Sequence, residues 1–233
     1  MSLAFVTGGS RGLGFETAKA LKSQGHHIVL FAKNAETLSS SAATLQNDFE
    51  VVDLENLNQT AEVFEKAITK YGVPDILMLA HGVMSDRMSK TLKTNLTEWK
   101  RVMTINLDSV FLIVNLVASK MAEARKGRVI IFSACLGRMS GPGNAGGLAP
   151  YRISKSGVNA LVRNLAHETG HGARGFWVDA ICPNHSRTDM GGADAPRSAA
   201  EGAETAVWLA TRELVPAESK TGLLWEDHEV VPW

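Results

Sequence analysis

The chain has 233 residues, of which 45% are hydrophobic and 21% charged, a composition typical of one folded domain and not of a disordered protein. Lysine and arginine number 24 and aspartate and glutamate also 24, so the zero net charge argues against a nucleic-acid surface or a polybasic membrane patch. The longest apolar run, 111–118, is interrupted by Asn115 and is too short to span a bilayer, and no signal peptide fits the N-terminus. We expect one cytoplasmic domain, residues 1–233, with no membrane or nucleic-acid partner.

Short apolar runs alternate with longer helical stretches along the whole chain. The runs predict strands at 3–6, 27–31, 49–52, 76–80, 129–132 and 177–181, with a seventh at 223–225. Most of these runs lack a strict alternation of apolar and polar residues, which is typical of strands buried on both faces in a parallel sheet. We therefore expect an α/β fold, a single-domain Rossmann-like doubly wound parallel sheet of about seven strands with helices on both faces.

The first turn of the chain is rich in glycine and joins a predicted strand to a predicted helix. Glycines there allow a pyrophosphate to approach the backbone, and the helix N-terminus offers free N–H groups. The spacing is Gly-x-x-x-Gly-x-Gly and not the common Gly-x-Gly-x-x-Gly, and a tight structural turn is the alternative interpretation. The candidate cofactor-binding residues here are Gly8, Ser10, Arg11, Gly12, Leu13 and Gly14.

The end of the second predicted strand bears on the choice between NAD and NADP. Enzymes that prefer NAD usually carry an acidic residue here, which holds the ribose 2′-hydroxyl, whereas this chain has Ala32 followed by Lys33. With Arg11 in the glycine turn, two cations and no carboxylate favour the 2′-phosphate of NADP. The alternative is that both are solvated surface charges.

Tyr151 and Lys155 are four residues apart at the start of a predicted helix, so they share one helix face. An ammonium close to a phenol favours the phenolate and lowers the pKa of the phenol, which prepares a general acid for a carbonyl or hydroxyl. Tyr-x-x-x-Lys is frequent by chance, but it is a strong signal behind such a glycine turn.

With these two motifs the chain resembles the short-chain dehydrogenase/reductase family over essentially its whole length, and its C-terminal residues resemble a carbonyl-reductase-like branch. The resemblance implies that Tyr151 is the proton donor, that Lys155 tunes it, and that Asn106 holds a proton relay. It also implies cofactor contacts from the segments that follow the third, fourth and sixth strands. These contacts are Asp53, Leu54, Ala80, His81, Gly82, Pro183, Asn184 and Thr188, together with Asn106, Tyr151 and Lys155.

The chain departs from the family pattern at three strand ends. After the fifth strand the family carries Ser-Ser with the second serine catalytic, whereas here Ser133 is followed by Ala134; Ser133 would substitute only if the backbone shifted by one residue. The family's Asn-Asn-Ala-Gly becomes 79–82, Leu-Ala-His-Gly, and Asn184 replaces the glycine after Pro183. Candidate substrate contacts are Ala134, Cys135 and His185, and a solvent-facing loop histidine is an equal alternative for His185.

Three further features bear on redox state, metals and assembly. Cys135 and Cys182 follow strands that should be neighbours, so they can approach one another, but two inert buried thiols are the favoured interpretation. The histidines lack zinc-site spacing, so we expect no metal. The stretch 110–118 is apolar almost all round, and the family resemblance implies that this helix packs against its symmetry mate in a homodimer or homotetramer; a thick core within a monomer is the alternative.

The sequence therefore favours an NADPH-dependent oxidoreductase that reduces a small carbonyl or imine substrate. Because the serine hydroxyl is missing, two alternatives stay open. One is a cofactor-binding protein that performs cyclisation, isomerisation or elimination without net redox chemistry, and the other is a protein with little catalysis.

Overall fold

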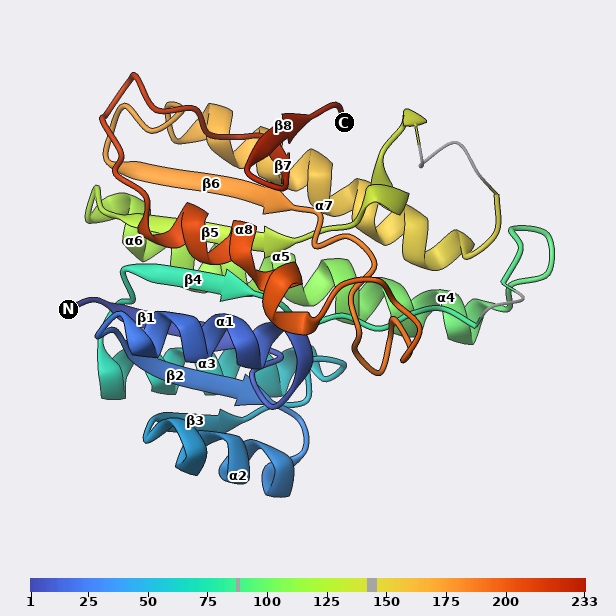
Figure 1. Ribbon diagram of the computed structural model, residues 1–233, viewed down its shortest axis with the longest axis horizontal. Coiled ribbons are helices and arrows are strands. Elements are labelled where there is room, and N and C mark those ends of the chain that lie inside the picture. Colours follow the sequence, from blue (N-terminus) through green and yellow to red (C-terminus); the bar gives the residue numbers. More distant parts are fainter. Residues whose placement is uncertain (87–88, 142–145) are drawn as a thin grey trace.

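A computed structural model describes residues 1–86, 89–141 and 146–233 (Figure 1). Within these residues eight strands form one sheet in the order β3-β2-β1-β4-β5-β6-β7-β8, and every neighbouring pair is parallel except β7 and β8. The strands are β1 (Leu3–Thr7), β2 (His27–Ala32), β3 (Asp48–Val51), β4 (Ile76–Leu79), β5 (Gly127–Phe132), β6 (Phe176–Ile181), β7 (Leu224–Glu226) and β8 (Glu229–Val231). The predicted doubly wound α/β fold is confirmed.

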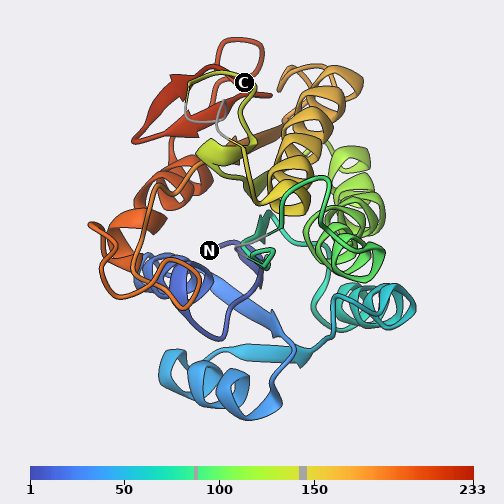
Figure 2. The ribbon, with the colours of Figure 1, turned by 90° about the vertical axis from the view of Figure 1, so that its right-hand side faces the viewer.

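Helices cover both faces of the sheet (Figure 2). One face carries α1 (Gly12–Ser23), α2 (Ala35–Leu45) and α8 (Ala199–Thr211), and the other carries α3 (Leu57–Tyr71), α7 (Ala149–Glu168) and the long helix Leu96–Glu123. The long helix consists of α4 (Leu96–Met103), η1 (Thr104–Asp108), α5 (Ser109–Ile113), η2 (Val114–Ala118) and α6 (Ser119–Glu123), and η1 and η2 are π-helical. A 3₁₀ turn, η3 (Cys135–Gly137), follows β5.

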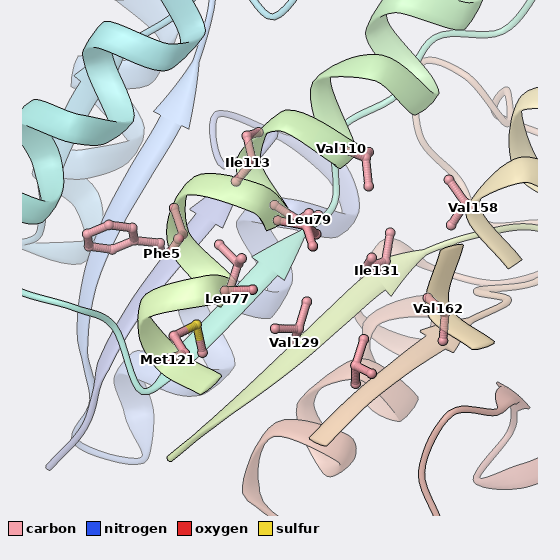
Figure 3. Close-up of a cluster of buried hydrophobic side chains, with 14 of the residues drawn as sticks. Phe5, Leu77, Leu79, Val110, Ile113, Met121, Val129, Ile131, Val158 and Val162 are labelled. Atoms are coloured by element: carbon pink, nitrogen blue, oxygen red, sulfur yellow. The ribbon is translucent and has the colours of Figure 1, made fainter. Parts of the chain in front are cut away.

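The strand sequences do not alternate between apolar and polar residues, because each strand contributes side chains to a hydrophobic core on either face of the sheet. Phe5 packs in the core beneath α3, α5 and α7 together with Leu77, Ile113 and Val162 (Figure 3). Its neighbour Val6 points to the opposite face and belongs to the core beneath α1, α2 and α8. This two-sided burial is what the sequence pattern predicted for parallel strands.

Side chains cap four of the helices but not α1. Asn34, Asn56 and Asn95 each accept a hydrogen bond from the backbone N–H three residues later, and Ser198 forms a capping box with Glu201. Arg11, the N-cap residue of α1, makes no side-chain capping bond. The first turn of α1 therefore keeps N–H groups for another acceptor at the carboxyl edge of the sheet, the edge at the right of Figure 1.

Two local features differ from the expectation. The sheet has an eighth strand, β8, because Asp227 and His228 both take positive φ (51° and 66°) and turn the chain back as a tight hairpin. The long helix is long and apolar enough to cross a membrane by length and composition alone, and its residues Val110, Ile113 and Val117 lie in the hydrophobic core.

Candidate active site

The glycine turn between β1 and α1 leaves no room for side chains at its key positions. Gly8 and Gly12 have φ of +65° and +57°, a region that favours glycine. A Cβ on Gly14 would lie 2.3 Å from the carbonyl oxygen of Gly8, and one on Gly12 would lie 3.2 Å from Cγ2 of Thr188. The carbonyl of Ser10 accepts a hydrogen bond from the Ser41 hydroxyl at 2.8 Å, and Leu13 packs against the core. The turn is thus close to the sheet switch between β1 and β4, where such folds bind ligands.

The two cations expected to bind a 2′-phosphate are both paired with carboxylates. Arg11 lies 2.5 Å from Asp189, and Nζ of Lys33 lies 2.7 Å from Oδ2 of Asp53. Burial of Asp53 opposes its ionisation and is the largest single effect, but the hydrogen bonds from Lys33 and from the Glu55 N–H, together with the charge of Lys33, lower the pKa of Asp53 overall. The end of β2 itself carries no carboxylate, as expected, but each of the two cations has a carboxylate partner from another segment. Leu54, beside Asp53, is buried in the core.

His81 is held by hydrogen bonds on both ring nitrogens. Nδ1 lies 2.6 Å from the Thr7 hydroxyl and Nε2 lies 2.9 Å from the Ser109 hydroxyl. Ser109 donates to the carbonyl of Ile105 at 2.7 Å, so it accepts from Nε2–H, and Nδ1 in turn accepts from Thr7. Burial, with the charge of Lys155, lowers the pKa of His81 to about 3. The imidazole is neutral and bridges β1, the end of β4 and the long helix. Ala80, one residue earlier, donates its N–H to the Thr7 hydroxyl at 3.1 Å.

Asn106, Lys155 and Gly82 converge at this edge of the sheet. The amide of Asn106 accepts from the N–H of Val83 at 2.8 Å and donates to the Val83 carbonyl at 2.9 Å. A Cβ on Gly82 would lie 3.4 Å from both Oδ1 of Asn106 and Nζ of Lys155, so Gly82 lies beside both groups. Ser154 accepts from Asn106 at 3.1 Å and donates to the Tyr151 carbonyl at 2.7 Å, which connects the asparagine to the helix turn of Tyr151 and Lys155.

The pair of Tyr151 and Lys155 is buried, and burial decides both pKa values. Nζ of Lys155 donates to the Phe132 carbonyl at 2.7 Å and lies 5.9 Å from the Tyr151 ring centroid. Burial lowers the pKa of Lys155 to about 8 and, assisted by charge on Cys182 and Cys135, raises the pKa of Tyr151. The expected lowering of the phenol pKa is therefore not observed in this structure. Its neutral form is the one that can donate a proton.

The hydroxyl of Ser133 is directed at helix α7. It donates to Oδ1 of Asn159 at 2.5 Å and lies 3.3 Å from the Lys155 carbonyl. Ala134, the next residue, has extended backbone angles and is buried. This arrangement gives no support to Ser133 as a donor to the substrate, because its proton has a partner inside the fold.

The segment after β6 carries the remaining candidates. Asn184 has φ of +57°, a conformation that asparagine tolerates, and its amide lies beside Asp227 of the C-terminal hairpin. His185 is exposed and donates from Nε2 to the Gly191 carbonyl at 2.7 Å, so it is folded back onto its own loop. Pro183 accepts from the Ser186 hydroxyl at 3.0 Å, and Thr188 faces Gly12.

The two cysteines lie next to each other, one of the arrangements that the sequence allowed: the N–H of Cys135 donates to Sγ of Cys182 at 3.0 Å, and both thiols are free. Between η3 and α7, residues 142–145 lie outside the described residues. Among those that are described, no group of three or more His, Cys, Asp or Glu is arranged to hold a metal.

Sequence reasoning missed the polar residues that hold the site together, Thr7, Ser109, Ser154 and Asn159. Two weak signals were available. A threonine ends an otherwise apolar β1, and Ser154 lies inside the Tyr-x-x-x-Lys motif. Asn159 is four residues beyond Lys155 on the same helix face, but its partner Ser133 is remote in sequence, so only the fold reveals the pairing.

The residues around the glycine turn fit a dinucleotide. Gly8, Gly12 and Gly14 form a cradle that added Cβ atoms would fill, and α1 directs uncapped N–H groups to the same place without an acidic residue in its first turn. The family model for short chain dehydrogenases matches residues 2–199. The chain belongs to the short-chain dehydrogenase family. Family membership and the oxidoreductase class of enzyme expected from the sequence are confirmed.

The similarity to individual members of the short-chain dehydrogenase family is below 30% identity in the examples that follow. The chain is 28% identical over 193 residues to the 3-oxoacyl-[acyl-carrier-protein] reductase of Chlamydia trachomatis, which covers 80% of this chain and 75% of that protein. A crystal structure of a ribose-5-phosphate isomerase from Brucella melitensis matches with a TM-score of 0.84 and 26% identity, covering 96% and 89% of the two chains. A blue fluorescent protein from a metagenomic library in complex with NADPH shares the fold, with a TM-score of 0.82 and 24% identity over 95% and 94%.

Proposed function

We propose that the protein is an NADPH-dependent reductase of a small carbonyl or imine substrate, with Tyr151 as the proton donor. The convergence of Tyr151, Lys155, Asn106 and Gly82 next to the glycine turn carries this proposal, since it supports a proton donor beside a dinucleotide site. When bound, NADPH supplies a hydride to the substrate carbon. Tyr151 gives its phenolic proton to the substrate oxygen or nitrogen, so the double bond becomes an alcohol or an amine.

Lys155 and Asn106 have supporting roles in this proposal. With its pKa lowered to about 8, Lys155 is still mainly cationic at pH 7, and its charge stabilises the phenolate that Tyr151 becomes after proton donation. The bond from Nζ to the Phe132 carbonyl fixes the position of the ammonium. Asn106, through its bonds to Val83 and Ser154, holds the end of β4 against α7 and keeps Gly82 beside Lys155.

The proposed preference for NADPH rests on Lys33 and Arg11. No acidic residue takes the position of Ala32 at the end of β2, and each cation lies at the carboxyl edge of the sheet beside the glycine turn. A bound 2′-phosphate would replace Asp53 and Asp189 as the partner of these cations, so its attraction to them must exceed the stability lost with two ion pairs. Exposed ion pairs contribute little in solvent, so binding of the phosphate should remain favourable.

A second function is favoured by one observation. Ala134 occupies the position of the family's catalytic serine, and the Ser133 hydroxyl is engaged with Asn159. Without this donor the site would stabilise a developing oxyanion less well, by on the order of 3 kcal/mol. Cyclisation, isomerisation or elimination without net redox chemistry, or little catalysis, is therefore the alternative, and one of the similar structures is named an isomerase.

One experiment separates these functions. The purified protein is mixed with NADPH and a panel of activated ketones, aldehydes and imines, and cofactor oxidation is followed by absorbance, with Tyr151→Phe as the control. Cofactor oxidation that depends on Tyr151 supports the reductase. Calorimetric NADPH binding without oxidation supports the alternative, and the absence of binding contradicts both.

We also propose a homodimer or homotetramer in the cytoplasm. Phe111 of α5 and Ile153 of α7 are 55% and 42% exposed, although each helix has its other side in the core. Two large apolar side chains exposed on helices that cover the same face of the sheet suit a second copy of the chain. Light scattering after size exclusion tests this assembly, and a monomeric mass at micromolar concentration would contradict it.

A further inference from the structure

Two thiols lie side by side at the edge of the active site. Strands β5 and β6 are neighbours with Phe132 opposite Ile181, and each strand is followed closely by a cysteine. The N–H of Cys135 donates to Sγ of Cys182 at 3.0 Å, so the sulfur of one residue lies against the backbone of the other. Cys182 is buried and Cys135 is half-buried, which gives the pair one side that solvent reaches.

The environment of the pair differs from that of inert thiols. The hydrogen bond from the Cys182 thiol lowers the pKa of Cys135, and the same bond, together with burial, raises the pKa of Cys182. The more exposed sulfur is thus the one that loses its proton more readily. Since the thiolate is the reactive form, Cys135 combines the two properties of a redox-sensitive cysteine, thiolate character and access, with a second thiol beside it.

We propose that Cys135 and Cys182 form a redox-active dithiol that hydrogen peroxide closes into an intramolecular disulfide. The Cys135 thiolate attacks one peroxide oxygen, the O–O bond breaks, and hydroxide leaves, so that Cys135 becomes a sulfenic acid and the peroxide is reduced. The Cys182 thiol then attacks the Cys135 sulfur, the S–S bond forms, and the S–O bond breaks. Water leaves with the Cys182 proton, and the sum is two thiols and one peroxide giving one disulfide and two waters.

Formation of the disulfide is expected to affect helix α7, which carries Tyr151 and Lys155. Cys135 begins η3, and a Cβ on Gly137 of the same turn would lie 2.7 Å from the backbone of Lys155. The Ser156 hydroxyl donates to the Gly137 carbonyl at 2.8 Å. Negative charge on either sulfur also raises the pKa of Tyr151, after the larger effect of burial. A change in turnover on oxidation is therefore expected, and this consequence alone rests on the proposed function.

The test is intact mass and peptide mapping of the full chain. Reduced protein is treated with a modest molar excess of hydrogen peroxide at neutral pH and then mapped without reductant. We expect a mass lower by about two hydrogens, a single cross-linked peptide containing Cys135 and Cys182, and recovery of both thiols with dithiothreitol. This readout needs neither cofactor nor substrate, so it is separate from a failure of the proposed function. Unchanged mass, sulfinic acid on Cys135 without a cross-link, or a disulfide between two chains would each overturn the proposal.

The matched variant is Cys182→Ala, which removes the partner and keeps Cys135. Alkylation of Cys135 by iodoacetamide is followed by mass at slightly acidic pH in both proteins, with a circular dichroism spectrum to show that the variant is folded. We expect alkylation to slow about tenfold in the variant, because the thiolate fraction of Cys135 falls. Equal rates would show that Cys182 does not activate Cys135 and would overturn the pairing. If Cys182→Ala fails to fold, the peroxide test on the unaltered chain still decides the proposal.

Discussion

Acidification should destabilise this fold through one buried histidine. His81 is 8% exposed, and both its ring nitrogens are hydrogen-bonded, to Thr7 and Ser109. Its pKa is lowered to about 3 by burial and by the charge of Lys155, whereas a histidine in an unfolded chain titrates near 6.5. Between these two values the unfolded state binds a proton that the folded state does not, so the free energy of unfolding falls as the pH falls.

The size of the effect follows from the two pKa values. At about pH 7 the unfolded histidine is mostly neutral, and at about pH 5 its protonation stabilises the unfolded state by about 2 kcal/mol. The folded imidazole stays neutral over this range, so nothing offsets that gain. The full loss of stability would be reached only near the folded pKa of about 3, where many carboxylates also titrate. The range from about pH 7 to about pH 5 therefore isolates the contribution of the histidine best.

Urea unfolding monitored by tryptophan fluorescence between about pH 5 and pH 7 measures this loss. In His81→Gln, which cannot titrate, the decrease in the free energy of unfolding should be smaller by about 2 kcal/mol than in the wild type. His26→Gln is the matched control, because burial also lowers the pKa of His26. This variant should keep the part of the pH-dependent loss of unfolding free energy that His81 causes. Equal pH dependence in wild type and His81→Gln would refute the reasoning, since it would mean that the buried imidazole is protonated or relaxed in the folded protein.

Three further outcomes follow from the site. Tyr151→Phe should abolish turnover and leave NADPH affinity by calorimetry nearly unchanged, whereas Lys155→Ala should reduce both; retained turnover in Tyr151→Phe would remove the tyrosine as the acid. Ala134→Ser should raise kcat/KM for activated ketones by about 10²-fold, because it restores a donor for the developing oxyanion, and no gain across the panel with intact cofactor binding would show that the native site lacks no donor. Lys33→Asp combined with Arg11→Ala should erode or invert the preference for NADPH over NADH in calorimetric titrations, and tighter NADH binding by the wild type would contradict the assignment.

The fold could be predicted from the sequence because its main signals are local or periodic. Strand residues such as Phe5 and Val6 are apolar on both faces, and the two cores beneath opposite helix layers explain that pattern. Strand β8 escaped prediction since it is three residues long and largely exposed, and its turn, Asp227-His228, lacks the glycine that usually marks such a hairpin.

The sequence singles out candidate residues that the fold brings to one edge of the sheet, but it does not report their electrostatics. Tyr151 and Lys155 were found from their spacing, yet the pKa of the tyrosine depends on burial, which spacing does not report. The pairing of Lys33 with Asp53 joins the ends of two strands, and only the register of the sheet brings them together. The same holds for Ser133, whose bond to Asn159 connects β5 to α7.

The π-helical turn η1 sets the rotation of one half of the long helix against the other. The turn itself carries Asn106, whose amide reaches Ser154 of α7, and the residues after it carry Ile113 into the core. A π turn holds more residues than an α turn, and each helical residue turns the chain by about 100°. Deleting the exposed Asp108 would therefore leave too few residues for the π turn and would change the direction in which the Asn106 amide leaves the helix toward Ser154. The chemistry of this protein thus depends on a residue count as much as on residue types.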